Sequence, residues 1–206
     1  MSQNTPDDLR VRRTRKLLRD ALVDQIEERG FDRLEVTEIA DRAMVNRATF
    51  YRHYHGKQDL LERCMDDVFE ELAGLITPPV TEDDAIDHHA PLKNLKLMLG
   101  HVEENAAFYR VMLGAQGPSA FASRIQDHLE KVTVERWQVM EPEGSGARMP
   151  PDLVIEFVAA AYVGVLHWWV EHGCQPGVDV MAAHLFTLTL YGPYYALGLV
   201  PGASAP

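Results

Sequence analysis

Apolar residues recur at spacings of three and four along most of the chain, which is the period of an amphipathic helix. In the first such segment they are Leu17, Leu18, Ala21, Leu22 and Ile26. No segment shows the sustained alternation of apolar and polar residues that is typical of a half-buried strand. The pattern therefore predicts an all-α fold.

The same pattern predicts about nine helices separated by short polar or glycine-containing stretches. They are expected over residues 9–28, 37–43, 47–55, 57–76, 92–103, 105–113, 119–140, 152–172 and 178–198. Gly30 stands where a helix C′ residue is expected, and Asn46 stands where an N-cap is expected. Residues 77–91 and 141–151 are rich in proline, glycine and polar residues and predict loops. Pro193 should kink or shorten the last helix.

Charge is distributed unevenly along the 206 residues, whose formal net charge is -11. Residues 1–63 carry 13 Lys and Arg against 12 Asp and Glu, while residues 64–206 carry 7 against 19. The acidic total argues against a protein that coats nucleic acid through bulk charge. A polyanionic partner could be tolerated at the first third of the chain.

Features that report on the compartment favour the cytoplasm. Cys64 and Cys174 stand far apart without metal-ligand spacing, so no disulfide is expected. The N-terminal residues lack the apolar region of a secretory signal. The most apolar run, residues 153–170, contains Glu156 and His167, which favours a buried core helix over a membrane span. No membrane partner is predicted.

The short helices expected at residues 37–43 and 47–55, joined by a tight turn, have the pattern of a helix-turn-helix. On a 100° wheel, Phe50 and Tyr54 fall on one side of the second helix. Small residues near its start and hydrogen-bond donors along it suit a helix that enters the DNA major groove. The small residues are Ala48 and Thr49, and the donors are Arg47, Tyr51, Arg52, His53 and Lys57.

The stretch VTEIADRAMVNRATFYRHYHGKQDLLERC closely resembles the DNA-binding signature of the tetracycline-repressor (TetR) family. The resemblance is strong over about residues 10–63 and rests elsewhere on length and the all-helical pattern. It implies a helix-turn-helix DNA-binding domain at residues 1–56 and a helical ligand-binding and dimerisation domain at residues 57–206.

The resemblance also implies roles for single residues. Thr37 would face the groove from the preceding helix, and Lys57 would face a phosphate. Arg47, Ala48, Thr49, Tyr51 and His53 would occupy the contact positions of the reading helix. Two positions depart from the family pattern. Glu35 replaces a phosphate-binding threonine, and Met44 replaces the glycine of the turn, so Met44 must bear strain or adopt a different turn.

The last two helices are expected to form a homodimer, because one helix-turn-helix reads too few base pairs to define one site in a genome. Small and apolar residues on these helices would allow a second helix to approach closely. They are Ala160, Ala161, Gly164, Ala183 and Leu190. The alternative is that these residues only fill the core of a monomer.

The resemblance further implies a cavity for a small, largely apolar effector in the larger domain. Methionine and aromatic side chains would line it, with histidines as polar anchors. They are Met98, His101, Phe108, Met112, Trp137, Tyr162, His167 and Trp168. A filled core with no cavity is the alternative, because such side chains more often serve packing.

Catalytic and metal-binding signatures are missing from the sequence. His167, Glu171 and His172 lack the spacing and partners of a zinc site, and no phosphate-binding loop or nucleophile motif is present. We therefore predict no cofactor, no metal and no enzyme activity. The main hypothesis is a dimeric regulator that binds double-stranded DNA and, in the manner of the family, represses transcription. The alternatives are a helical scaffold that has lost specific DNA binding and, least favoured, an enzyme built in the helical domain.

Overall fold

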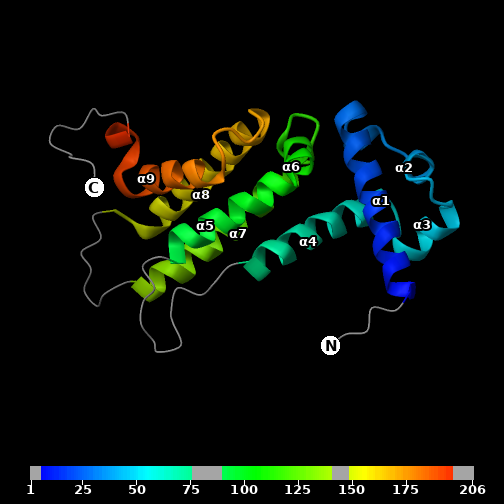
Figure 1. Ribbon diagram of the computed structural model, residues 1–206, viewed down its shortest axis with the longest axis horizontal. Coiled ribbons are helices and arrows are strands. Elements are labelled where there is room, and N and C mark those ends of the chain that lie inside the picture. The colour runs from blue at the N-terminus through cyan, green and yellow to red at the C-terminus, as the bar shows by residue number, and fades with distance from the viewer. Residues whose placement is uncertain (1–5, 76–89, 141–148, 197–206) are drawn as a thin grey trace. The chain divides into compact units, whose positions relative to one another are not determined.

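The computed structural model describes residues 6–75, 90–140 and 149–196, and every regular element in these ranges is helical (Figure 1). Side chains are described for the same ranges except residues 6–8, 135–140 and 193–196. The predicted all-α class is confirmed. Most of the two predicted loops, 77–91 and 141–151, lies outside the described residues.

Nine α-helices and one 3₁₀ turn make up the described chain. In order they are α1 (Pro6–Arg29), η1 (Phe31–Arg33), α2 (Val36–Arg42), α3 (Arg47–His53), α4 (Lys57–Leu75), α5 (Ala90–Glu104), α6 (Ala106–Leu113), α7 (Ser119–Met140), α8 (Pro151–Glu171) and α9 (Val178–Ala196). The predicted helices agree with these bounds to within a few residues. The η1 turn was not predicted, because three residues are too few to show a period.

The helices group into two compact units. The first unit comprises residues 1–73 and 107–121, and the second comprises residues 74–106 and 122–206. By packing, α4 and α6 therefore belong with the helix-turn-helix, whereas the sequence placed a boundary at residue 56. α6 is separated from α5 by Asn105 alone, so the chain passes from one unit to the other within a few residues.

The core of the first unit forms where α1 packs on the helix-turn-helix and α4. Leu18, Leu22 and Ile26 of α1 are almost fully buried, as are Phe50 of α3 and Leu60 of α4. A second aromatic cluster involves α6, in which the rings of Phe108 and Phe121 lie 5.4 Å apart edge to face. Of the apolar stripe predicted for α1, Leu18, Ala21, Leu22 and Ile26 are buried, whereas Leu17 is 36% exposed.

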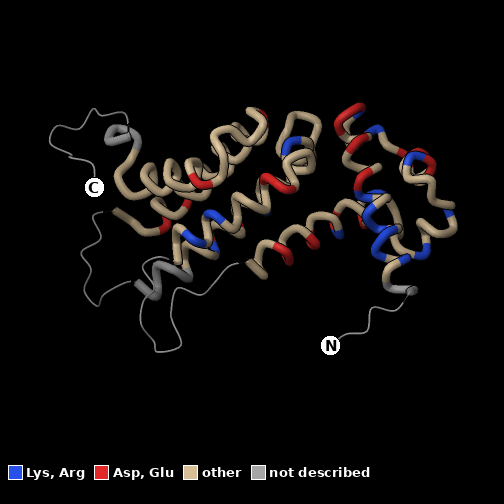
Figure 2. The backbone as a smooth tube through the Cα atoms, viewed as in Figure 1, with Lys and Arg blue, Asp and Glu red and all other residues tan. Residues whose placement is uncertain are grey.

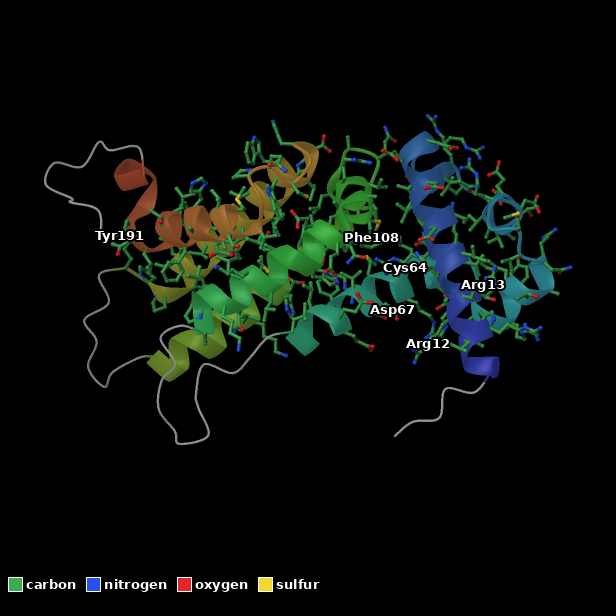
Figure 3. All side chains as sticks on the ribbon, viewed as in Figure 1. Arg12, Arg13, Cys64, Asp67, Phe108 and Tyr191 are labelled. Carbon is green, nitrogen blue, oxygen red and sulfur yellow. The ribbon has the colours of Figure 1, made fainter. Side chains whose placement is uncertain are left out.

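Two details of the first unit agree with the sequence. Gly30 ends α1 with φ 77°, and its N–H donates to the carbonyl of Ile26 at 2.8 Å, so the predicted C′ glycine is confirmed. Cys64 of α4 is 3% exposed, and burial raises the pKa of its thiol to about 12 (Figure 3). Cys174, in the second unit, is likewise buried and free. The predicted pair of free thiols is thus confirmed.

The second unit is held by the packing of α5 on α9 and by the buried side of α8. Trp169 of α8 is fully buried, and its indole N–H donates to the carbonyl of Pro176 at 2.7 Å. The helical path of α9 breaks at Gly192, which has φ 81° and ψ 169°. The residue before a proline is disfavoured in helical geometry. The predicted effect of Pro193 on the last helix is confirmed.

α8 differs from the buried core helix that the sequence predicted. It has a mean hydropathy of 1.7 over its most apolar window, yet only 28% of that window is buried. By length and composition alone it is the one helix in the described ranges that could cross a membrane. Its exposed side chains include Leu153, Phe157 and Trp168. The prediction of burial was wrong because hydropathy does not show whether the partner surface lies in the same chain.

Candidate nucleic-acid interface

The turn between α2 and α3 is a Schellman motif in which a methionine takes the place usually held by glycine. The N–H of Val45 donates to the carbonyl of Ala40 at 2.9 Å, and the N–H of Met44 donates to the carbonyl of Asp41 at 3.0 Å. Met44 has φ 53° and is 89% exposed. Left-handed geometry costs a residue with a Cβ about 1–2 kcal/mol. Of the two expectations for Met44, the structure thus shows strain within an ordinary turn.

The start of α2 is closed by carboxylates. The N–H of Glu35 donates to Oε2 of Glu38 at 3.1 Å, and Arg29 donates to the other oxygen of Glu38 at 2.9 Å. These hydrogen bonds, with Arg29 as the larger cause, hold the pKa of Glu38 below its ordinary value. Negative charge therefore stands at the helix N-terminus where a phosphate could otherwise bind. Thr37, the second residue of α2, is half-buried.

α3 presents a polar face and buries an aromatic one. Asn46 is its N-cap, because Oδ1 accepts from the N–H of Ala48 at 2.8 Å, as predicted. Phe50 is 0% exposed and Tyr54 is 4% exposed, whereas Tyr51 is 50% exposed. The remaining predicted contact residues of α3 divide by exposure. Arg47, Ala48 and Arg52 are exposed, and Thr49 and His53 are half-buried. The predicted division of α3 into two faces is confirmed.

Positive charge surrounds the end of α3. The pKa of His53 is lowered by its burial and then by the charges of Arg52 and Arg15. Arg15 belongs to α1, so the N-terminal half of α1 lies next to the end of α3. Tyr54, between them, has its pKa raised to about 12 by burial. An anion near His53 would neutralise the charges that hold its pKa down.

Lys57 points into the protein, which differs from the phosphate-facing position that the sequence predicted. Its Nζ donates to the carbonyls of Leu34 at 2.8 Å, Asp32 at 2.9 Å and Phe31 at 3.3 Å. The ammonium also lies 5.2 Å from the centre of the Phe31 ring. An ammonium has three N–H donors, and here all three are used. Lys57 therefore joins the start of α4 to the η1 turn and, in this structure, has no donor left for DNA.

The N-terminal turns of α1 carry a group of basic residues to which sequence reasoning gave no role (Figure 2). Arginines or lysines occupy six positions: Arg10, Arg12, Arg13, Arg15, Lys16 and Arg19. Arg12 and Arg13 are labelled in Figure 3 at the start of this helix. The run of basic residues was visible in the sequence. Their position beside α3 was not, because it depends on how α1 packs.

The predicted dimer residues lie on an exposed side of α8 and α9. Ala160, Ala161, Gly164, Ala183 and Leu190 are all exposed. Large apolar side chains accompany them, and the structure adds these to the predicted set: Leu153, Phe157, Trp168, Val180 and Tyr191. We call these ten residues the apolar face. If the five predicted dimer residues only filled the core of a monomer, which was the alternative, they would be buried.

The predicted effector residues are divided between the two units. Phe108 and Met112 are buried in the first unit, where the Arg19 guanidinium lies 4.5 Å from the centre of the Phe108 ring. Met98, His101 and Tyr162 belong to the second unit, and the hydroxyl of Tyr162 is 3.1 Å from that of Thr189. The side chain of Trp137 lies outside the described residues.

His167 and Trp168 lie at the surface of the second unit, and their role in effector binding stays a prediction. Trp168 is 48% exposed and stacks on His172 with ring centres 4.4 Å apart. A surface pocket of about 100 Å³ is found instead in the first unit. It is polar and is lined by Arg15, Tyr54, Arg63, Asp66, Asp67 and Glu70. Within the described residues, no group of three His, Cys, Asp or Glu side chains could hold a metal ion.

Comparison with known proteins assigns the family. Residues 18–64 match the family model of bacterial regulatory proteins of the tetR family, and residues 90–191 match that of a transcriptional regulator C-terminal region. The chain belongs to the TetR family. It is therefore a helix-turn-helix transcriptional regulator and not an enzyme.

Three similar proteins illustrate how far the likeness extends. Over 97 residues the chain is 26% identical to the dhaKLM operon transcriptional activator DhaS of Lactococcus lactis, and the match spans 47% of each protein. A TetR transcriptional regulator from Streptococcus agalactiae has a TM-score of 0.63 at 22% identity, covering 89% of this chain and 97% of that one. FadR from Bacillus subtilis, solved in complex with stearoyl-CoA, has a TM-score of 0.61 at 16% identity, covering 86% and 98%. The structures share the TetR fold.

Proposed function

We propose that this TetR-family protein is a cytoplasmic homodimer that binds a pseudo-palindromic operator and represses transcription until a small, largely apolar effector releases it. The observation that supports the dimer most directly is the apolar face. Phe157 is 64% exposed and Leu153 is 59% exposed on α8, and Leu190 is 56% exposed on α9. Exposed apolar patches of this kind mark protein–protein contacts. Another copy of the chain is the partner that a two-fold operator requires.

The dimer explains why one subunit can carry so short a reading helix. α3 has seven residues, and only its exposed positions can reach base edges. Two such helices held by a two-fold axis would read two half-sites separated by roughly 34–36 Å, one turn of DNA. Arg47, exposed at the start of α3, is the residue we assign to a base edge, while Arg52 at its end suits a phosphate.

The effector is proposed from the family and not from a cavity. FadR from Bacillus subtilis was solved with stearoyl-CoA, so a relative of this fold binds a ligand with a long apolar chain. The helices of the second unit that would enclose such a ligand carry Met98, His101 and Tyr162. Ligand binding releases DNA only if the ligand prefers the conformation that does not bind DNA.

We assign α6 to carry this preference, because two contacts tie it to α1. Phe108 lies under the Arg19 guanidinium, and Arg110 pairs with Glu27 at 3.4 Å. Just beyond α6, a Cβ added to Gly30 would meet Oε1 of Gln116 at 2.7 Å. Since Asn105 alone separates α6 from α5, a shift of α5 on ligand binding would reach α1 and the reading helix through α6.

The dimer can be tested at a position where a larger side chain fits within one subunit. A Cβ added to Gly164 of α8 meets no atom within 4 Å, so Gly164→Leu is compatible with the fold of one subunit. We expect this variant to sediment as a monomer, because the added side chain would occupy space that the partner needs. Gly100→Leu on α5 is the matched control, since Gly100 is equally open. A Gly164→Leu dimer as stable as that of Gly100→Leu would refute the interface.

DNA reading and release need their own experiment. Selection of bound duplexes from a random pool should recover an inverted repeat, and Arg47→Ala should change the preferred bases at a cost of about 1–3 kcal/mol per lost contact. Release is then measured on the selected duplex with fatty acyl-CoA esters of increasing chain length. Failure to recover any repeat would favour the scaffold hypothesis. Recovery without release by any acyl-CoA would remove this effector class only.

A further inference from the structure

We infer that Arg10 and Arg13, in the first turns of α1, bind the DNA backbone beside α3 and supply the phosphate contacts that Lys57 and the start of α2 do not. The inference rests on the proposed function, since it extends the operator-binding surface. Neither residue belongs to the predicted interface or to the region, residues 18–64, that the DNA-binding family model matches.

The positions at which phosphate binding was first expected are used for other purposes. All three donors of the Lys57 ammonium bind carbonyls of residues 31–34. The N-terminus of α2 is covered by Glu35 and Glu38. A DNA-binding surface without phosphate contacts would lack the term that supplies most of the non-specific affinity. Arg52 at the end of α3 suits one phosphate, so other cations near α3 must supply the remaining contacts.

Arg10 and Arg13 lie on the side of α1 that faces the helix-turn-helix. Arg10 precedes Glu28 by 18 residues, or five helical turns, and Arg13 precedes Asp24 by 11 residues, or about three turns. Glu28 and Asp24 pair with Arg42, the last residue of α2, at 2.8 and 3.8 Å. The same side of α1 is therefore acidic where it meets α2 and basic toward its N-terminus.

This basic stretch continues the positive surface of α3. The charge of Arg15 reaches His53, so α3 ends beside the N-terminal half of α1. Figure 2 shows the blue segments of α1 and α3 gathered in the same part of this unit. Arg10 and Arg13 are exposed, and among the described residues no ion pair holds either guanidinium. Long, charged and unpaired side chains in this place suit a polyanion that runs past the end of α3.

Arg12 and Arg19 provide an internal comparison. Arg12 lies seven residues, or about two turns, before Arg19, which puts both on one side of α1. That side faces α6, because the Arg19 guanidinium lies over the ring of Phe108. Arg10 and Arg13 lie about 100–180° around the helix from these two arginines, so the two pairs point in different directions.

The test compares two double variants of the full chain that lose the same charge. Arg10→Gln/Arg13→Gln and Arg12→Gln/Arg19→Gln are each titrated with the selected operator duplex and with an unrelated duplex of equal length, over a range of KCl concentrations. The plot of log affinity against log salt concentration has a negative slope, and each lost phosphate contact should reduce its steepness by about 0.9. We expect a decrease of about 1.8 for Arg10→Gln/Arg13→Gln on both duplexes, with base preference unchanged.

The outcomes separate the two proposals. Equal slopes for wild type and Arg10→Gln/Arg13→Gln would overturn the inference, and so would an equal decrease in both double variants, because net charge alone would then explain it. A wild-type chain that binds the two duplexes equally would refute the proposed function instead. Circular dichroism checks that the helices are retained; if the double variant is less helical, Arg13→Gln alone is measured, with an expected decrease of about 0.9.

Discussion

The two units of this TetR-family protein expose opposite kinds of surface. In the first unit the exposed side chains around α3 and the start of α1 are basic, and the large aromatic residues Phe50 and Tyr54 are buried. In the second unit α8 exposes two large aromatic side chains, with Phe157 64% exposed and Trp168 48% exposed. A basic surface can stay hydrated until a polyanion binds. Exposed apolar side chains grouped on one face instead favour a protein surface that stays bound to them. We therefore expect the first unit to bind its partner, DNA, reversibly, and the apolar face of the second unit to stay bound to another protein surface.

The largest effect is expected from charging the apolar face. Ala161→Arg places a guanidinium among exposed apolar side chains of α8, where it would have to be buried without a partner in the dimer. We expect monomers that no longer bind the operator, measured by sedimentation and by gel shift. Val134→Arg on α7 is the control, because Val134 is also a partly exposed apolar residue but lies outside the apolar face. An intact Ala161→Arg dimer would place the interface elsewhere.

The next effect concerns Lys57, whose substitution distinguishes a role in the stability of the first unit from a role in DNA contact. Lys57→Met removes three hydrogen bonds from a charged donor to the carbonyls of residues 31–34. We expect the free energy of unfolding to fall by about 2 kcal/mol, measured by urea denaturation. The salt slope of DNA binding should stay as in wild type.

A charge-preserving variant completes this test. Lys57→Arg keeps the positive charge, but a planar guanidinium cannot direct three donors at converging carbonyls as an ammonium does. It should therefore be destabilised while it binds DNA with an unchanged salt slope. A slope lowered by about 0.9 in Lys57→Met alone would restore Lys57 as a phosphate contact.

A smaller effect, of opposite sign, is expected at the turn. Met44→Gly removes the strain of φ 53° and leaves both Schellman hydrogen bonds in place. We expect a stabilisation of about 1 kcal/mol, seen as a higher Tm. Ala43→Gly, next to it, is a control, because Ala43 has φ -73° and a glycine there gains nothing. A Tm that falls in Met44→Gly would mean that the methionine side chain makes a stabilising contact.

The smallest effect is a proton linkage at His53. In the free protein its pKa is lowered by burial and by Arg52 and Arg15. DNA phosphates would neutralise these arginines, so the pKa of His53 should be higher in the complex. Binding then takes up protons, and affinity should rise as pH falls below the ordinary histidine value of about 6.5. His53→Gln should flatten this dependence. A wild-type affinity that falls over the same pH range would show that His53 does not face phosphate.

The sequence predicted the elements better than it predicted their surroundings. The helix bounds, the Asn46 cap, the two faces of α3 and the break at Pro193 depend on neighbouring residues, so a local pattern carried them. The direction of the Lys57 side chain and the exposure of α8 could not be predicted from a local pattern. The donors of Lys57 meet carbonyls of residues about 25 positions earlier in the chain, and the exposure of α8 depends on which helices pack against it. The predicted effector set draws on both units, as Phe108 and Tyr162 illustrate, and it stays a prediction.

Cys64 has a consequence for the chemical signals that this regulator can receive. Its sulfur lies in the packing of the DNA-binding unit at 3% exposure, with a pKa near 12. The thiolate is the form that reacts with peroxides and alkylating agents, and at neutral pH this site holds almost none of it. Cys174 is also buried, and burial raises the pKa of its thiol as well. Both thiols of the folded protein are therefore poor targets for oxidants, which agrees with the proposal of an effector that binds without a covalent bond.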